Sequence, residues 1–400
     1  MLKLNREYVE KFIDDIEFYH FQKKAEKIYL SKMNSGENMS GWIDYPLHFD
    51  IGEICSYIDD VKKDDTILVV IGIGGSYLGA SAAIQMLNPQ DADKVYFIGP
   101  TMDTDYLYKI IKECEKHDCL INVISKSGST FETSFYFDIF KNMLQHKYGE
   151  EFNKHICCTT GDHGVLFDEA QIDNYKIFNI PDNIGGRYSV LTAVGLLPMY
   201  FSGIRIGEIL YGAKSCNRDL MGFCNEAYEY AIMRNILYKH GYDVELFVSY
   251  KESFNLFNEW LKQLFGESEG KENKGIFPSS AIFSRDLHSL GQFLQEGKKH
   301  IFETSLHVLN ENKIDSEYVD YYKIKNINNS IVNGAAQAHS EGDTPVLIIE
   351  VDNVDDYHLG YMFYFFETAC AMSAYLFDVN PFNQPGVELY KKYMKNWLKS

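Results

Sequence analysis

Short apolar runs alternate with amphipathic segments along most of the chain. From residue 66 onward, each apolar run is followed by a stretch whose apolar positions recur every three or four residues. The first pattern predicts buried strands, and the second predicts helices. Because continuous apolar strands between helices are typical of parallel sheets covered on both faces, the alternation predicts an α/β fold. The expected strands span 66–72, 94–99, 120–124, 155–160, 175–181, 243–250, 275–283, 300–308 and 345–352.

Helical periodicity connects most of these strands. A longer helical stretch is expected over roughly 189–240, where it interrupts the alternation and separates two α/β units. Residues 1–32 are also expected to be helical, because their start, MLKLNREYVEKFIDD, follows an amphipathic pattern. The other helices are expected near 76–87, 103–115, 131–147, 253–265, 286–296, 327–339 and 357–377, with a basic helix at the end of the chain.

These patterns predict two doubly wound parallel-sheet domains between an N-terminal helical segment and a C-terminal arm. The expected divisions are residues 1–48 for the N-terminal segment, 49–205 and 206–376 for the two domains, and 377–400 for the arm helix. The second domain is expected to start between residues 205 and 240.

Composition narrows the classes of partner and location. The formal net charge of −19 over 400 residues argues against nucleic acid or an anionic membrane as the main partner. The longest apolar run, YMFYFFETACAMSAYLF, is interrupted by Glu367 and is short for a membrane span, so a buried helix is expected. The eight cysteines show no CxxC pairing, which indicates reduced thiols, and the N-terminus lacks the apolar core of a signal peptide. A cytoplasmic protein is therefore expected.

The turns that follow the strands are the first places to search for a site, because ligands of such sheets bind beyond the carboxyl ends of the strands. The segment VVIGIGGSYLGASAA contains three glycines that permit a sharp turn with exposed amides, and Ser76 is expected at the helix N-cap. The segment matches neither the dinucleotide fingerprint nor a P-loop. Tight strand–helix packing and anion binding therefore both remain open.

A second turn, SKSGSTFET, contains several hydroxyl groups and one lysine. Ser129 and Glu132 fit a capping box, with Ser129 as the N-cap and Glu132 as the third helical residue. The capping box leaves Ser125, Lys126 and Ser127 unexplained. Hydroxyls and amides at a helix N-terminus beside an ammonium group suit a phosphate, so an anion site is expected here, supported by the cap.

Three further segments carry side chains suited to acid–base chemistry. NIGGRYSVL places Arg187 on a Gly-Gly turn, where its charge can stabilise a developing oxyanion. WLKQLFGESEGK is expected to end a helix at Gly266 and to place Glu267 just beyond it, where the negative helix end strengthens a base. SRDLHSLGQFLQEG places His288 in the first turn of a helix, which suits a proton shuttle. The ordinary alternatives are an inert surface arginine, a charged loop after a C-cap and a structural histidine.

Motifs for metal binding do not occur in the sequence. There is no HExxH, no paired CxxC and no histidine–carboxylate cluster at ligand spacing. Acid–base chemistry without a metal or a cofactor is therefore expected.

In combination and order, these segments resemble the glucose-6-phosphate isomerase family, also called the phosphoglucose isomerases, and especially its shorter bacterial form. GIGGSYLGASAA resembles the family's first phosphate-side turn, and SKSGSTFET resembles its phosphate loop. NIGGRYSVLTAVGLLP and YLFDVNPFNQPGVELYKK resemble its two signature segments. KQLFGESEGK and DLHSLGQFLQEG resemble the segments with its base and its histidine. The resemblance implies two flavodoxin-like sugar-isomerase (SIS) domains and a C-terminal arm.

The resemblance also implies an aldose–ketose isomerase of glycolysis and gluconeogenesis that interconverts glucose 6-phosphate and fructose 6-phosphate through a cis-enediol. Glu267 would move a proton between C1 and C2, and Arg187 would stabilise the developing charge. His288 and Lys391 would assist ring opening, with His288 supplied by the partner subunit of a homodimer. The implied phosphate and sugar contacts are Ser125, the amide of Lys126, Ser127, Thr130, Gly75, Ser76, Gln263 and Gln384.

One position departs from the family pattern, and three other functions are weighed against this one. Ser129 stands where relatives more often carry threonine, which preserves the hydroxyl. An isomerase of mannose or amino-sugar phosphates is disfavoured by the order of GGRYSV and NQPGVELYKK. A sugar-phosphate sensor is disfavoured because no helix-turn-helix or basic segment is evident, and a nucleotide-dependent oxidoreductase because the fingerprint fails.

Overall fold

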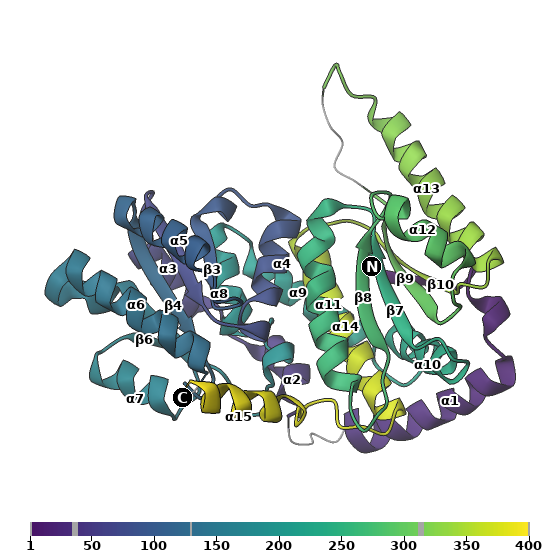
Figure 1. Ribbon diagram of the computed structural model, residues 1–400, viewed down its shortest axis with the longest axis horizontal. Helices are drawn as coiled ribbons and strands as arrows, with labels where there is room; N and C mark the ends of the chain where they lie inside the picture. Colours follow the sequence, from purple (N-terminus) through teal and green to yellow (C-terminus); the bar gives the residue numbers. More distant parts are fainter. Residues whose placement is uncertain (1, 34–38, 129, 311–315, 399–400) are drawn as a thin grey trace.

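The computed structural model describes residues 2–33, 39–128, 130–310 and 316–398, which form two five-stranded sheets with helices packed around them (Figure 1). The first sheet has the strand order β3-β2-β4-β5-β6, and all its strands are parallel. The second has the order β1-β10-β9-β7-β8, in which β1 alone runs antiparallel. The strands are β1 Leu2–Asn5, β2 Thr66–Ile71, β3 Val95–Ile98, β4 Asp118–Ile124, β5 Ile156–Thr160, β6 Lys176–Asn179, β7 Val244–Ser249, β8 Phe277–Ile282, β9 Ile301–Val308 and β10 Val346–Val351.

The order of the parallel strands confirms the predicted α/β class. Within each sheet the strand that comes first in the unit lies between the second and the third, which is the flavodoxin-like order. In the first sheet this arrangement makes β2 and β4 neighbours although β3 lies between them in the chain. The turns after β2 and β4, which carry the glycine-rich and serine-rich segments, therefore lie side by side.

The helices lie near the predicted ranges, and the stretch over 189–240 consists of α8, α9 and α10. The described helices are α1 Asp15–Ile28, α2 Gly41–His48, α3 Gly52–Val61, α4 Leu78–Leu87, α5 Thr104–Lys116, α6 Phe131–Tyr148, α7 Val165–Ile172, α8 Ala193–Ser202, α9 Ile206–Asp219, α10 Glu226–Lys239, α11 Asn255–Glu269, α12 Leu287–Glu296, α13 Tyr321–Glu341, α14 Asp356–Leu376 and α15 Val387–Trp397.

The N-terminal residues form a strand, so the prediction of a helix from residue 1 is wrong. Leu2 and Leu4 are buried and Lys3 is exposed, which is the alternation of a half-covered strand. Leu2 pairs with Val351, and β1 thereby becomes an edge strand of the second sheet. The helical pattern is correct only from Asp15 onward. The alternation of buried and exposed positions covers only four residues, which is too short to distinguish a strand from the start of the amphipathic helix pattern that follows. The divisions expected near residues 49, 206 and 377 stay a prediction.

Alternate side chains of the central strands enter different cores. Leu68 and Val70 of β2 belong to a large apolar cluster that also contains Phe247 of the second sheet. Val69 and Ile71 belong to a cluster with side chains from α5 and α6. Because both faces of β2 are covered, its six residues are all buried, as the continuous apolar run predicted.

Helix α14 lies at the centre of the molecule, where it packs against α9, α10 and α11. Residues 358–376 of this helix are all buried, which confirms the predicted buried helix. Its apolar side chains belong to the cluster that contacts both sheets, so one core joins the two units. Within the described residues, no helix combines the length and the apolar character needed to cross a lipid bilayer.

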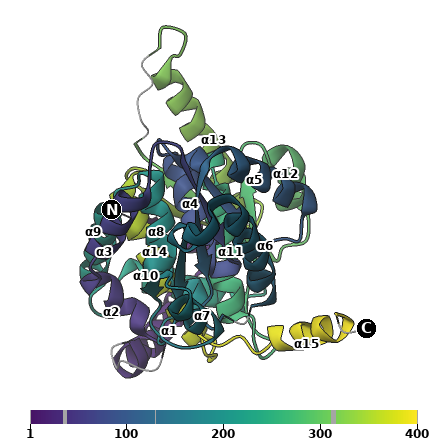
Figure 2. The same ribbon diagram turned by 90° about the vertical axis from the view of Figure 1, so that its left-hand side faces the viewer.

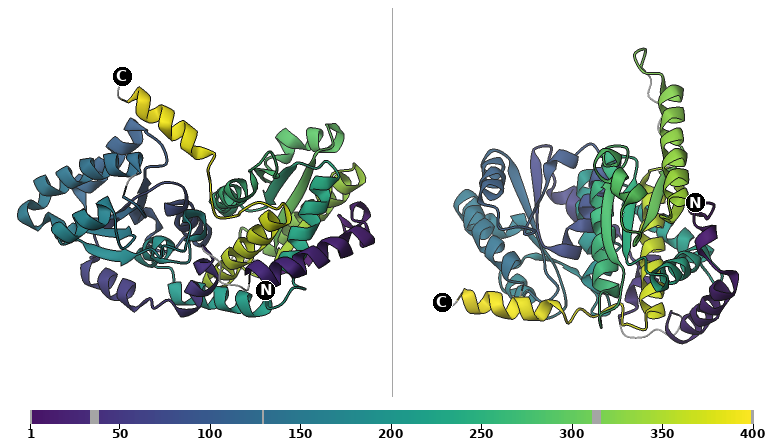
Figure 3. Two further views of the ribbon diagram at one scale, coloured as in Figure 1. Left: turned by 90° about the horizontal axis from the view of Figure 1, so that it is seen from below. Right: turned by 45° about the vertical axis from the view of Figure 1, so that its right-hand side comes forward.

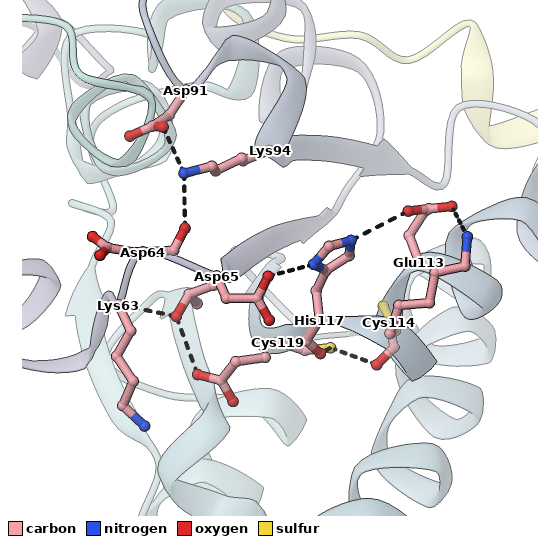
Figure 4. A network of polar contacts seen from close by, with 12 residues as sticks. Lys63, Asp64, Asp65, Asp91, Lys94, Glu113, Cys114, His117 and Cys119 are labelled. Atoms are coloured by element: carbon pink, nitrogen blue, oxygen red, sulfur yellow. Dashed lines mark hydrogen bonds and ion pairs between the residues drawn. The ribbon is translucent and has the colours of Figure 1, made fainter.

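Polar contacts join the amino ends of β2, β3 and β4 (Figure 4). His117 Nδ1 lies 2.6 Å from Asp65 Oδ1, and these residues directly precede β4 and β2. Lys94, directly before β3, donates to the Asp64 carbonyl at 2.9 Å and pairs with Asp91 at 2.8 Å. These contacts brace the edge of the sheet opposite to the strand-to-helix turns, so the network has a structural role.

Candidate active site

Two glycine-containing turns pack against each other beyond the end of β2. One is the 3-10 turn Gly74–Ser76 (η3), and the other is Gly186–Tyr188 (η6). A Cβ atom at Gly75 would lie 2.0 Å from the Gly186 carbonyl oxygen, a distance that no side chain tolerates. The absence of a side chain at Gly75 therefore brings Arg187 beside the first turn.

The expected N-cap at Ser76 is wrong, because the chain makes the extra 3-10 turn before helix α4. Tyr77 is the N-cap and Leu78 is the first helical residue. Gly74 has a φ of +60°, which glycine adopts readily. This conformation inserts a turn that glycine spacing alone does not reveal.

Arg187 connects α11 with the segment between α14 and α15. Its side chain is 2% exposed, and its five N–H groups all have acceptors. Nε donates to Ser268 Oγ at 2.9 Å, and Nη1 donates to Glu267 Oε2 at 3.2 Å and to Gln384 Oε1 at 2.7 Å. Nη2 donates to the backbone carbonyls of Pro381 and Asn383. Pro381, Asn383 and Gln384 belong to residues 377–386, which we call the C-terminal linker. Arg187 is thus a fixed positive charge that holds a carboxylate and the linker together.

Glu267 lies inside the last turn of α11, so the prediction that this helix ends at Gly266 is wrong. The helix continues to Glu269, and Gly270 N–H donates to the Gly266 carbonyl at 3.1 Å. A Cβ atom at Gly266 would lie 3.3 Å from the Pro278 ring, so this glycine permits close packing on β8 rather than a C-cap.

The Glu267 carboxylate is held from two sides. Gln263, one turn earlier on α11, donates from Nε2 to Glu267 Oε1 at 3.2 Å. Arg187 binds the other oxygen, Oε2. The Gln263 Oε1 atom is buried and has no protein partner among the described residues, which leaves an acceptor directed at the same region. A carboxylate, a guanidinium and a free amide acceptor are therefore adjacent.

A buried ionic network fixes the end of α11 behind this group. Arg234 of α10 donates to Glu245 of β7 at 2.9 and 2.6 Å, and to both carboxylate oxygens of Glu269. It also donates to Ser373 Oγ of α14 at 2.6 Å. The three charged side chains are fully buried. Burial raises the pKa of Glu269, although the guanidinium opposes this rise.

The serine-rich turn after β4 contains an internal hydrogen bond and a lysine bridge. Ser125 Oγ accepts from Gly128 N–H at 3.1 Å. Lys126 Nζ donates to the carbonyls of Asp182 and Ile184 at 2.6 and 3.1 Å. Burial lowers the pKa of Lys126. The ammonium group thus braces the turn that carries Arg187, which leaves the backbone amide of Lys126 as the predicted phosphate contact.

The expected capping box does not form as predicted. Helix α6 begins at Phe131, and Thr130 is its N-cap without a side-chain capping bond. Glu132 is consequently the second helical residue and not the third. Ser129, the predicted N-cap, lies outside the described residues. The helix therefore starts one residue later than its capping pattern indicated, while Thr130 remains at its N-terminus.

Two predicted site residues lie apart from this cluster within the chain. His288 is exposed in the first turn of α12, which lies at the upper end of the molecule, whereas the linker and α15 lie at the lower end (Figures 1 and 2). Lys391 is in α15, a helix without buried residues that projects from the body (Figure 3). Its ammonium group pairs with Glu388 of the same helix at 2.9 Å.

Some residues of the cluster were not predicted. Ser268 and Lys271 follow Glu267 closely in the segment GESEGK, so proximity to the predicted base was an available sequence signal. The backbone carbonyls of Pro381 and Asn383, which accept from Arg187, had no sequence signal, because every residue type has a backbone oxygen. Burial, followed by the nearby Arg187 charge, lowers the pKa of Lys271 to about 8.

A separate surface group brings three possible metal ligands together. One ligand atom each from Asp162, His163 and Asp182 lies within 4.8 Å of the others. All three side chains are exposed, and exposed acidic groups commonly cluster without an ion. We assign no metal role to them.

Known proteins resemble this chain in sequence and in fold. Residues 52–281 match the family profile described as phosphoglucose isomerase. The chain is 46% identical over 393 residues to glucose-6-phosphate isomerases of Bacillus thuringiensis and Bacillus anthracis, which covers 91% of this chain and 87% of each relative. A hypothetical protein from Thermus thermophilus has a similar structure, with a TM-score of 0.88, 25% identity and full coverage of both chains. A glucose-6-phosphate isomerase from Chlamydia trachomatis shares the fold at a TM-score of 0.80 and 20% identity, over 99% of this chain and 91% of that one. The chain belongs to the phosphoglucose isomerase family.

Proposed function

We propose that this protein interconverts glucose 6-phosphate and fructose 6-phosphate by acid–base catalysis through a cis-enediol. The observation that carries the proposal is the Glu267 carboxylate held between Gln263 and Arg187, close to the glycine-rich turn. Moving a carbonyl between adjacent carbons needs one base for the carbon-bound proton and a positive charge near the enediolate oxygens. Both groups are present at the carboxyl end of the first sheet.

In the proposed reaction, the Glu267 carboxylate removes the proton from C2 of the open-chain aldose and returns it to C1, while the hydroxyl proton moves from O2 to O1. The positive charge of Arg187 stabilises the negative charge that develops on the oxygens. Because the five donors of Arg187 are all engaged, its field contributes without a new hydrogen bond from the guanidinium. Gln263 and Gln384 are proposed to contact the sugar hydroxyls, beside Gly75 and Ser76.

The phosphate is proposed to bind the serine-rich turn, through the hydroxyls of Ser125, Ser127 and Thr130 and the amide of Lys126. The N-terminus of α6 begins one residue beyond Thr130, and its partial positive charge favours an anion. Binding energy from this remote group would position the reacting carbons beside Glu267.

A coupled assay of fructose 6-phosphate conversion in the presence of a chelator tests the activity. Glu267→Gln should lower kcat by about 1,000-fold or more, because it removes the base. Binding of a non-isomerisable analogue such as sorbitol 6-phosphate should change little. The matched control is Glu259→Gln on the same helix, whose carboxylate contacts Lys262 and Ser280. Near-normal turnover of Glu267→Gln would refute the proposed role of Glu267 as the base. Preferential turnover of mannose 6-phosphate would refute glucose 6-phosphate as the preferred substrate.

We also propose a homodimer in which His288 reaches the site of the partner subunit. The exposure of His288 and the distant position of α12 support this arrangement. Mixing the inactive variants Glu267→Gln and His288→Ala tests it. A mixed dimer would have one site with both changes and one intact site, so random pairing should restore roughly a quarter of wild-type activity. No recovery, despite mixed dimers shown by native mass spectrometry, would refute a histidine acting across subunits.

A cytoplasmic location is proposed as well. All eight cysteines lie within the described residues and are free thiols, six of them buried. Free thiols are typical of a reducing compartment.

A further inference from the structure

Lys271 lies on a tight turn just beyond α11, four residues after Glu267. Its ammonium group donates to the backbone carbonyl of Asn380 in the C-terminal linker. The backbone of Lys271 is fixed as well, because its N–H donates to the Glu269 carbonyl at 2.7 Å and its carbonyl accepts from Lys274 N–H at 2.8 Å. Lys271 is therefore a half-buried cation at a defined place.

Cationic side chains hold the linker at several points. Arg187 Nη2 binds the carbonyls of Pro381 and Asn383, and Lys271 binds that of Asn380. The consequence for the site is direct, because the linker carries Gln384 to Arg187 Nη1.

The linker has room to move if one tether is lost. A cavity of about 580 Å³ lies between the 270–274 turn and Asn380, Asn383, Pro385 and Gly386. Phe377, Val379 and Pro381 of the linker are buried and Phe382 packs against Tyr188, whereas Asn380 and residues 383–386 are exposed. Beyond Phe382, polar tethers therefore determine where Gln384 lies.

The charge of Lys271 also acts on the groups around it. The charged and titratable groups that face it are Arg187 from η6, Glu267 and Glu269 from α11, and Cys370 from α14. Burial and then Arg187 lower the pKa of Lys271 to about 8, so its ammonium form dominates below that pH and the neutral amine dominates above it.

We propose that Lys271 is a positioning residue of the isomerase site, which keeps Gln384 beside Glu267 through its bond to Asn380. This inference rests on the proposed function. It assigns a specific role to a residue that would otherwise belong to a solvated loop.

Three variants test the inference. Lys271→Met removes the charge and the tether, whereas Lys271→Arg retains both. Lys274→Met is the matched control, because Lys274 lies in the same turn and binds the Phe377 carbonyl at 3.1 Å but pairs with the exposed Glu272 at 3.7 Å. The measurements are kcat, KM and the pH profile of kcat/KM from pH 5 to 10, together with hydrogen exchange of the linker amides.

Lys271→Met should lower kcat roughly 10- to 100-fold, which is the usual cost of a misplaced catalytic group, with KM within about threefold. Lys271→Arg should keep kcat within about threefold. It should also lose any alkaline limb near pH 8, because arginine stays charged. Lys274→Met should keep kcat within about threefold and leave the alkaline limb in place.

The outcomes separate this inference from the proposed function. An unchanged kcat in Lys271→Met would overturn the inference, as would an equal fall of kcat in Lys274→Met. If the wild-type enzyme did not isomerise the sugar phosphate, the proposed function would fail instead. Hydrogen exchange remains informative in that case, because faster exchange of linker amides in Lys271→Met would support the tether and unchanged exchange would overturn it.

Discussion

Replacing Arg234 by methionine would test how the buried network supports the end of α11. The guanidinium is fully buried and makes five hydrogen bonds, two to Glu245, two to Glu269 and one to Ser373. Methionine fills a similar path through the core but cannot donate. Arg234→Met would therefore leave two carboxylates in the core without their cation, two residues from the proposed base Glu267.

The expected loss of unfolding free energy is about 3–5 kcal/mol at pH 7, the usual cost of removing one partner of a buried ion pair. Adding the separate contributions of five charge-assisted hydrogen bonds would give a larger loss. The actual loss is smaller because folding of the variant no longer requires the removal of water from a guanidinium group. The loss should be smaller at pH 5. Burial without Arg234 raises the pKa of Glu269 further, so the native variant retains a proton that the unfolded chain releases, and its stability falls as the pH rises above 4.5, the ordinary carboxyl value.

Urea unfolding of the wild type and the variant at pH 5 and pH 7 measures both effects. The control is Arg218→Met, whose side chain is 66% exposed and contacts Asp219 at 3.5 Å, and whose cost should stay below about 1 kcal/mol. The reasoning fails if Arg234→Met costs no more than this control at pH 7, or if its cost is the same at both pH values. A parallel fall in kcat under native conditions would show that the network also positions Glu267.

Three other changes give independent expectations. Gly75→Ala should lower the free energy of unfolding by about 1–3 kcal/mol and remove most activity, because its Cβ would meet the Gly186 carbonyl. The control Gly186→Ala has free space for its Cβ and should change the melting temperature little. Equal effects of the two changes would contradict the packing of the two turns. Glu367→Met should raise stability by about 1–3 kcal/mol at pH 7, because both oxygens of this buried carboxyl have no protein partner within the described residues and burial raises its pKa well above 4.5. The gain should vanish towards pH 4, where the unfolded chain is protonated too, and a gain independent of pH in denaturation curves would argue for packing alone. Ser125→Ala combined with Thr130→Ala should raise KM for the sugar phosphate about tenfold or more, and an unchanged KM in the coupled assay would refute the phosphate site.

The fold class could be predicted from sequence because the strands are covered on both faces and are therefore apolar throughout. The same logic failed at Leu2 and Leu4, where an edge strand covered on one face shows only a brief alternation. It also failed at Gly266, because a glycine near the end of a helical pattern fits a helix end and close packing on a neighbouring proline equally well. A local sequence pattern predicts the structure at such positions only when contacts with elements distant in the chain do not override it.

The candidate site divides in the same way. Glu267, Gln263 and Arg187 were named from their segments, and the structure brings them into contact. The sequence could not show that Arg187 directs its donors at backbone carbonyls, because such acceptors leave no trace in residue identity. It also could not place His288, because the position of α12 relative to Glu267 on α11 depends on how these two helices pack around the second sheet.

The pairing of β1 with β10 has a consequence for synthesis in the cell. Leu2 leaves the ribosome before its partner Val351, which follows 349 residues later. At about 5–20 residues per second, that delay is roughly 20–70 s. Throughout this interval the leucine-bearing N-terminal strand has no edge to pair with, while the first sheet, which uses only residues 66–179, can already close. The nascent chain must therefore keep β1 available until β10 appears, and β1 is open to chaperone binding or premature pairing during that interval.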